Sequence, residues 1–333
     1  MTVLVTGSAG HLGEALMRAF RGMARPALGV DVKPSPFTDR VGSIGDRGFV
    51  AECMRGVRTV IHAATLHKPH VITHTKHDFV DTNITGTLVL LEAAVAEGVE
   101  CFLYTSTTST FGAALTPAAG EPAAWVTEAV APIPKNIYGV TKLAAESLCE
   151  LFSRKENLAT LVLRTSRFFP EDDDDASMRS EYETANSQAN ELLYRRVDIE
   201  DVVSAHRLAE QRARAPGFRA EIGFRRYIIS ATTPFRQGDL AGLRLDAVDV
   251  VRRLFPECDA LYGARGWKLF PSIDRVYVND LAMAELGWRP KYDFRHVLES
   301  LRINEDFRSP LAREVGKKGY HATVFDKGPY PVA

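Results

Sequence analysis

Cysteine is scarce in this chain, and its acidic and basic residues almost cancel. The four cysteines among 333 residues are widely spaced and form no C-x-x-C pair, which is typical of reduced, mostly buried thiols in a cytoplasmic protein. The formal net charge of −1 gives no electrostatic basis for binding nucleic acid or an anionic membrane. Both classes of partner are therefore not expected.

The sequence also has no long apolar run and no internal repeat, and no leader segment is expected. No uninterrupted apolar stretch is long enough to span a bilayer. The first expected strand begins at residue 2, so we expect no signal peptide before it. A hydrophobic content of 45% with 25% charged residues is that of a soluble globular protein with one large or two modest domains.

A glycine-rich turn lies at the start of the chain, between a short apolar strand and an expected helix. Three glycines follow the apolar residues 3–5 with G-x-x-G-x-x-G spacing. The first allows a sharp turn, the second lets backbone N–H groups approach a pyrophosphate, and the third allows close helix packing. An anion there would meet the positive end of the helix dipole. The candidate cofactor-binding residues of this turn are Gly7, Gly10, His11, Leu12 and Gly13.

An acidic residue follows the turn at the distance used by dinucleotide-binding folds. The expected strand 27–31 ends in Asp31, roughly 20 residues after the glycines, where a carboxylate can accept hydrogen bonds from ribose hydroxyls. Asp31 favours NAD over NADP because it would repel a 2′-phosphate, although Lys33 nearby carries the opposite charge. The turn and the acid together predict dinucleotide binding.

Three later residues are further candidates for the cofactor site. Asp46 could face the adenine, or it could cap the helix that follows it. Ala63 and Ala64 end an expected strand over 59–64, where small side chains would let a dinucleotide lie across the strand's carboxyl end. Close packing is the alternative explanation for this alanine pair.

Four histidines fall between residues 67 and 77, and their spacing could place three imidazoles on one helix face. Pro69 interrupts the segment, and no Cys, Asp or Glu completes an obvious set of ligands, so we expect no metal. His67 and Lys68 directly follow the alanine pair and are better candidates for lining a substrate pocket.

A hydroxyl-rich strand end and a Tyr–Lys pair could supply proton-transfer chemistry. The expected strand 101–107 runs into a series of threonines and serines. Tyr138 and Lys142 share one face of an expected helix over 138–154. An ammonium beside a phenol lowers the phenol's pKa, so Tyr138 is a plausible proton shuttle to an alcohol or carbonyl oxygen. Such pairs also occur by chance on surface helices, and the glycine turn and the strand end make this one specific.

The second half of the chain has fewer motifs. Strands are expected over 159–164 and 226–230, and a helix over 197–211. The acidic run Glu171–Asp175 is interpreted as a solvated, mobile loop. From about Asn304 the periodicity is weak, which predicts an arm.

The alternation of strands and helices, with these motifs in this order, closely resembles the extended short-chain dehydrogenase/reductase family, the NAD-dependent epimerase/dehydratase group. The resemblance covers roughly residues 1–300. It implies a Rossmann-like, doubly wound parallel sheet with a smaller C-terminal α/β substrate-binding region. Residues 1–166 and 196–230 would form the NAD-binding domain, 167–195 and 231–305 the substrate-binding region, and 306–333 a C-terminal arm. Beyond the glycine turn, the landmarks are Asp31, His62–Ala64, Asn83, Ser106, Thr107, Tyr138, Lys142, 198–201 and 286–290.

The same resemblance assigns roles to these residues. Tyr138 would be the acid/base, Lys142 would bind the nicotinamide ribose, and Thr107 would hold the substrate oxygen. Relatives often pair through two long helices, here 79–97 and 138–154, which implies a homodimer with a four-helix interface. Asn83, Ser106 and Phe168 would join the cofactor site, and Thr108, Phe169 and Arg275 the substrate site, the last as a phosphate-binding arginine.

Departures from the family pattern narrow the chemistry. Thr108 and Ser109 stand where sugar dehydratases carry Asp-Glu, so dehydration is not expected. The remaining chemistry is epimerisation of a sugar or nucleotide sugar through a transient ketone, with NAD retained. The alternative is oxidation or reduction of a free sugar, sugar acid or small secondary alcohol with exchangeable NAD. The short, acidic segment between Pro170 and Val197 argues against a nucleotide diphosphate. An inactive relative that senses dinucleotide or binds a partner is a third possibility.

Overall fold

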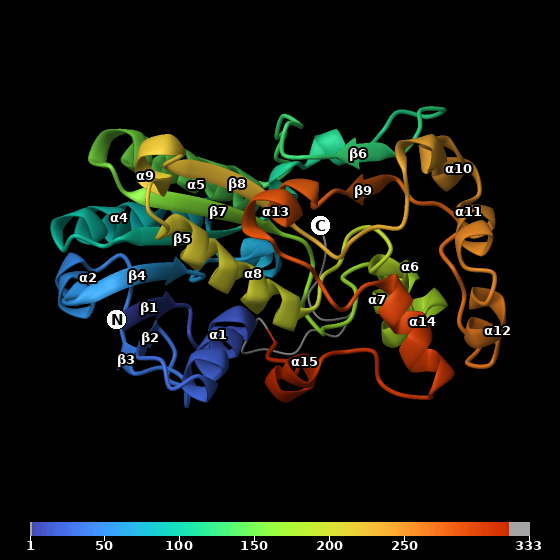
Figure 1. Cartoon of the computed structure of the whole chain (residues 1–333), viewed down its shortest axis with the longest axis horizontal. Helices are drawn as coiled ribbons and strands as arrows, with labels where there is room; N and C mark the ends of the chain where they lie inside the picture. The colour runs from blue at the N-terminus through green and yellow to red at the C-terminus, as the bar shows by residue number, and fades with distance from the viewer. Residues whose placement is uncertain (1, 320–333) are drawn as a thin grey trace.

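A seven-stranded parallel sheet forms the centre of the computed structural model, which describes residues 2–319 except the side chains of residues 219 and 220 (Figure 1). The strand order is β3-β2-β1-β4-β5-β7-β8, so the direction of winding reverses between β1 and β4. Ligands of doubly wound sheets bind at such a switch point, beyond the carboxyl ends of the strands. The strands are β1 (Thr2–Thr6), β2 (Ala27–Asp31), β3 (Arg40–Val41), β4 (Val57–His62), β5 (Cys101–Thr107), β7 (Ala159–Thr165) and β8 (Phe224–Ile229).

Helices cover both faces of this sheet, as the predicted fold class requires. On one face, α1 (His11–Gly22), α8 (Ile199–Ala213) and α13 (Asp280–Leu286) pack in one apolar core with the sheet. On the other face, α2 (Arg47–Met54), α4 (Gly86–Ala96) and α5 (Ile137–Glu156) form a second core. Because both faces are covered, the central strands are continuous apolar runs rather than alternating ones.

The predicted helix over 79–97 is more complex in the structure. It runs without interruption from Lys76 to Ala96, as α3 (Lys76–Phe79), a π-helical turn over Val80–Thr85, and α4. By length and composition alone this helix could cross a membrane, and 44% of its apolar window is buried within the protein. The side chains of Leu90, Leu91 and Ala94 pack into the core of the sheet, which is typical of a core helix.

A smaller region with its own apolar core lies at the carboxyl ends of the strands, beside the sheet in Figure 1. It contains a two-stranded parallel sheet of β6 (Ala124–Val126) and β9 (Arg275–Tyr277). β6 lies within the proline-containing stretch 113–134, which has no strand periodicity in its sequence. The other helices are α6 (Ala176–Glu181), α7 (Thr184–Glu191), α9 (Phe218–Glu221), α10 (Leu240–Leu245), α11 (Ala247–Leu254), α12 (Cys258–Gly263), α14 (Phe294–Arg302) and α15 (Pro310–Val315). Short 3₁₀ turns span Lys68–Ile72, Thr108–Thr110, Ala113–Leu115 and Gln237–Asp239.

One expectation for the second half is wrong. The acidic run is not a solvated loop, because the side chains of Glu171, Asp173 and Asp174 are only 8–10% exposed and each is bonded to a basic side chain. The described part of the expected arm contains a helix: α15 packs against α1 and α8, and Ser309 N donates to Asp198 Oδ2 at 3.0 Å. Residues 320–333 of the expected arm lie outside the described residues.

A buried carboxylate joins α5 to three strands of the sheet. Glu146 is fully buried and accepts hydrogen bonds from Ser106 Oγ at 2.6 Å, Arg164 Nη2 at 2.7 Å and Arg226 Nε at 3.1 Å. The Arg164 guanidinium lies over the Phe111 ring, 4.9 Å from its centroid. One side chain of α5 thus fixes this helix to β5, β7 and β8.

Replacing Glu146 by alanine is expected to lower the free energy of unfolding by about 3–5 kcal/mol, because the Arg164 charge would remain buried without its partner. Glu150→Ala is the matched control on the same helix. Its partly exposed pair with Arg226 should contribute at most about 1 kcal/mol. Urea denaturation of the three proteins measures both values, and equal losses for the two variants would contradict the prediction.

Candidate active site

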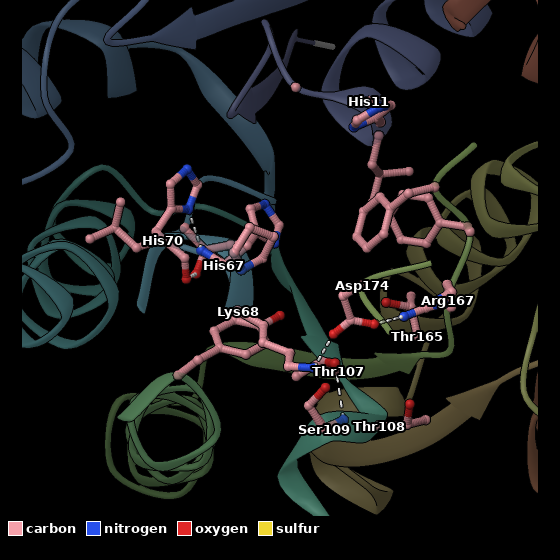
Figure 2. Close-up of a pocket in the computed structure, with 18 of the residues that line it drawn as sticks. His11, His67, Lys68, His70, Thr107, Thr108, Ser109, Thr165, Arg167 and Asp174 are labelled. Atoms are coloured by element: carbon pink, nitrogen blue, oxygen red, sulfur yellow. Dashed lines mark hydrogen bonds and ion pairs between the residues drawn. The ribbon is translucent and has the colours of Figure 1, made fainter. Parts of the chain in front are cut away.

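A large cavity of about 2140 Å³ lies between the sheet and the smaller region (Figure 2). Its lining includes the turns that follow β1 and β4 and the last residues of β5 and β7. The cavity therefore occupies the position at which the sheet topology predicts a ligand.

The glycine turn forms one end of the cavity, and its geometry leaves no space for side chains. A Cβ atom on Gly13 would lie 1.9 Å from the carbonyl oxygen of Gly7. Gly7 has a φ of +76°, and a Cβ on it would lie 2.7 Å from the backbone nitrogen of Ala64. No side chain caps α1 at Gly10, so the start of this helix presents backbone N–H groups to an anion. Gly7, Gly10, His11, Leu12 and Gly13 all line the cavity.

Asp31 lies at the carboxyl end of β2, next to the glycine turn. Its Oδ2 accepts a hydrogen bond from Ala9 N at 3.0 Å, and its Oδ1 accepts one from Lys33 N at 2.9 Å. The carboxylate lines the cavity and keeps lone pairs that can accept from ribose hydroxyls. Ala63 and Ala64 line the same part of the cavity, so these residues together fit a dinucleotide.

Two predicted cofactor residues are not among those that line the cavity. Asp46 caps α2, and its Oδ1 accepts from the backbone N–H groups of residues 48 and 49 at 2.9 and 3.1 Å. Asn83 is buried, and its side chain bonds both backbone groups of Leu66 and the hydroxyl of Thr141. Asp46 thus follows the capping alternative. Asn83 positions the loop after β4 against α5.

The proton-transfer residues meet where β5 ends and α5 begins. Thr107 is the last residue of β5, and Asn136 caps the start of α5 by accepting from Gly139 N at 3.0 Å. Burial raises the pKa of Tyr138 to about 12, and a hydrogen bond with the Thr107 side chain acts in the opposite direction. Both side chains line the cavity.

Lys142 differs from its expected role in one respect. Its Nζ donates to the Thr105 carbonyl oxygen at 2.6 Å and lies 4.1 Å from the centroid of the Tyr104 ring. Burial lowers the pKa of Lys142 to about 7, against the attraction of Glu146. The pKa of Tyr138 is raised rather than lowered, so the expected effect of the ammonium is not present in the protein alone. Ser106 lines the cavity, while its hydroxyl is held by Glu146.

All of the predicted substrate-binding residues line the same cavity. The His67 ring lies 6.1 Å from the Tyr138 ring and 5.9 Å from the Phe169 ring, centroid to centroid. Burial lowers the pKa of His67 well below its usual range, which keeps the imidazole neutral. Phe168 and Phe169 lie together, with ring centroids 4.5 Å apart. Lys68, Thr108 and Arg275 also line the cavity.

Several charged residues of the cavity were not identified from the sequence. Asp174 lies between Lys68 and Arg167 and forms ion pairs with both, as Figure 2 shows. Arg167 also pairs with Asp173 and with Glu191. The sequence indicated only that Phe168, next to these residues, would lie near the cofactor. It gave no reason to expect ion pairs between Arg167, Asp174 and Lys68.

The histidine segment forms a local structure of its own. His67 caps the 3₁₀ turn Lys68–Ile72, and its backbone N–H donates to His70 Nδ1 at 2.9 Å. Within residues 2–319, no group of three or more His, Cys, Asp or Glu side chains is arranged to hold a metal ion.

Lys142→Met should stabilise the protein at pH 7, because the fold disfavours the buried ammonium. The pKa of Lys142 is lowered to about 7 in the fold, so the penalty is full below that pH and disappears above the usual lysine value of about 10.4. The free energy of unfolding should rise by up to a few kcal/mol at pH 7 and by little at pH 10.5. Exposed Lys155→Met on the same helix is the control, and a pH-independent gain would contradict this cause.

Two curated relatives match most of this chain, and a third matches about half of it. dTDP-glucose 4,6-dehydratase of Streptomyces antibioticus is 29% identical and is matched over 94% of this chain and 96% of its own length. UDP-glucose 4-epimerase of Rhizobium meliloti is 25% identical over 90% and 95%. The protein y4nG of Sinorhizobium fredii is 31% identical over a shorter match, 49% of this chain and 40% of that protein.

The fold is shared with solved structures of short-chain dehydrogenases/reductases. A superfamily member from Agrobacterium tumefaciens with bound NAD superposes with a TM-score of 0.62 at 22% identity, covering 94% of this chain and 99% of its own. The sequence profile of the NAD dependent epimerase/dehydratase family matches residues 3–222. The chain therefore belongs to this family of enzymes, whose cofactor is NAD, as its sequence motifs predict.

Proposed function

We propose that this protein epimerises a nucleotide sugar by oxidising one secondary alcohol to a transient ketone and reducing it on the other face. The observation that carries the proposal is that Thr107 and Tyr138, the two hydroxyl-bearing residues of the predicted catalytic pair, both line a cavity that also contains the glycine turn. Bound NAD would accept a hydride from the carbon that bears the hydroxyl group and return it to the same carbon. The glycine turn, Asp31, Ala63, Ala64, Lys142 and Phe168 are the residues that would hold it.

In this mechanism Tyr138 moves the proton and Thr107 holds the oxygen. The Tyr138 phenolate would take the hydroxyl proton as the alcohol becomes a ketone, and the phenol would return it when the ketone is reduced. The hydroxyl of Thr107 fixes the position of the reacting oxygen and of the phenol together. Burial holds Tyr138 in its protonated form, so the chain must lower the phenol's pKa when its ligands are bound.

The residues at the remaining cavity wall support epimerisation over dehydration. Thr108 and Ser109 both line the cavity directly after Thr107. A threonine and a serine cannot supply the carboxylic acid and carboxylate that remove water from a sugar. The relative named as a dehydratase matches this chain over most of its length. The chemistry proposed here differs from dehydration, because it needs only Tyr138, Thr107 and the cofactor.

Two arginines of the cavity favour a substrate with an anionic group. The Nε atoms of Arg195 and Arg275 are buried and have no hydrogen-bond partner among the described residues. Both side chains line the cavity, and an unsatisfied buried donor is costly until an acceptor binds. The acidic run was expected to repel a diphosphate. In the structure, however, ion pairs with Lys68 and Arg167 balance the charge of Asp174. These features support a nucleotide sugar over a free sugar.

Tyr138→Phe tests the chemistry directly. With UDP-glucose and UDP-galactose as probes, chromatography should show their interconversion by the wild-type protein without net reduction of NAD. The variant should lose about 100-fold or more in kcat, since it removes the proton shuttle. It should still bind NAD, which a fluorescence titration would show. Reduced NAD that accumulates with turnover would contradict epimerisation and support a dehydrogenase.

We propose further that two copies pair through α4 and α5, forming a four-helix interface. These helices pack against one another, and α5 carries apolar side chains on its exposed face, where Val140 and Leu151 are 48% and 41% exposed. An apolar strip of this kind is typical of a surface that a partner covers.

Leu151→Glu should convert a dimer into a monomer, because it places a charge in the proposed interface. Sedimentation or light scattering measures the mass, and Leu245→Glu is a control at an equally apolar but distant exposed position, 85% exposed on α10. A wild-type monomer, or a dimer that both variants leave intact, would contradict the proposed interface.

A further inference from the structure

Three segments that are far apart in the sequence meet at the carboxylate of Glu171. This side chain is 9% exposed, and its Oε1 lies 2.8 Å from His11 Nε2. The same oxygen accepts hydrogen bonds from Lys318 N at 3.0 Å and Gly319 N at 3.2 Å. A single oxygen atom thus joins the glycine turn, the acidic run and the C-terminal segment 317–319.

Ion pairs hold the same three segments around this junction. Lys318 Nζ pairs with Glu14 in the first turn of α1, and Lys317 Nζ lies 2.8 Å from Asp172 Oδ1. Glu14 is also held by Arg18, at 2.8 Å. The C-terminal segment is therefore attached both to α1 and to the acidic run.

The junction lies at the dinucleotide end of the cavity. His11, Lys318 and Gly319 line that cavity, together with Gly10 at the uncapped start of α1. The ring of His11, labelled in Figure 2, also contacts the ring of Phe169, with centroids 5.5 Å apart, so the residue that Glu171 binds also contacts one of the cavity's aromatic rings. A cofactor that occupies this end would be bordered by residues which Glu171 holds in place.

We infer that Glu171 retains the cofactor: by joining His11 to the backbone of Lys318 and Gly319, it keeps the C-terminal segment against the dinucleotide site. NAD then leaves only when this junction opens. The inference goes beyond the proposed function and depends on the dinucleotide site alone, not on the substrate. Retention of this kind suits an enzyme that oxidises and reduces within one turnover, because the cofactor never needs to exchange.

The dissociation rate of NAD from the full chain tests this inference. Protein loaded with NAD is diluted into a large excess of a fluorescent NAD analogue, and the exchange is followed with time. Glu171→Ala removes the shared acceptor and leaves partly buried donors unpaired, so release should be about 10- to 100-fold faster. Glu171→Gln keeps one acceptor oxygen and removes the charge, so it should give a smaller increase. Lys318→Met keeps the backbone donor and should also have a smaller effect.

Glu314→Gln is the matched control, because Glu314 lies on α15, just before the C-terminal segment, and among the described residues it pairs at the surface with Arg18, 3.3 Å away. It should leave the release rate within about twofold of the wild type. Release that is unchanged in both Glu171 variants would overturn the inference, as would equal acceleration in Glu314→Gln. If Glu171→Ala does not fold, Glu171→Gln with an unchanged melting temperature decides. The rate needs no substrate, so its outcome is independent of the Tyr138→Phe test.

Discussion

The geometry of the candidate active site depends on the carboxylate of Glu146, which is fully buried and is not among the residues that line the cavity. Glu146 lies one helical turn beyond Lys142 on α5, and it draws Ser106, Arg164 and Arg226 of three different strands onto one face of that helix. Tyr138 and Thr107 come from different elements, so the position of one hydroxyl relative to the other depends on how α5 lies on the sheet. A helix attached by apolar packing alone could slide or rotate, whereas a buried carboxylate with fixed partners admits one arrangement. Glu146, at the middle of α5, therefore positions the proposed proton-transfer residues Tyr138 and Thr107 relative to one another.

Charge balance dominates the rest of the cavity. Arg167, Arg195 and Arg196 converge on the buried Glu191, and their proximity lowers the pKa of its carboxyl to about 2 despite burial. Asp173 and Asp174 add two more carboxylates to the same cluster. The arginines are thus held in fixed positions by protein acids, and a ligand would meet donors whose orientation is already set. Preorganised donors of this kind bind without the cost of ordering long side chains.

Local features were predictable from the sequence and distant pairings were not. The glycine turn, Asp31 and the Tyr138–Lys142 pair each depend on residues close together in the chain, so their spacing and their order along the chain identified them. The acidic run was interpreted as solvated because composition does not reveal that Lys68, 106 positions before Asp174, would reach it. Glu171 and Lys318, 147 positions apart, meet for the same reason: the fold, not the local pattern, brings them together. β6 escaped detection because three residues in a proline-rich loop give no periodicity.

The π-helical turn over Val80–Thr85 has a consequence for how this helix tolerates changes in length. A π turn holds one more residue than an α turn, so everything before it is rotated by about 100° relative to a continuous α-helix. The amide of Asn83 lies in this turn and reaches both Leu66 and Thr141. Deleting one residue of the turn other than Asn83 would convert it to a regular α-helix, and the amide of Asn83 would then point away from the loop that borders the cavity. A related chain without the extra residue would need a one-residue gap at this turn when it is aligned with this chain. An alignment that omits the gap would pair the wrong residues on one side of the turn.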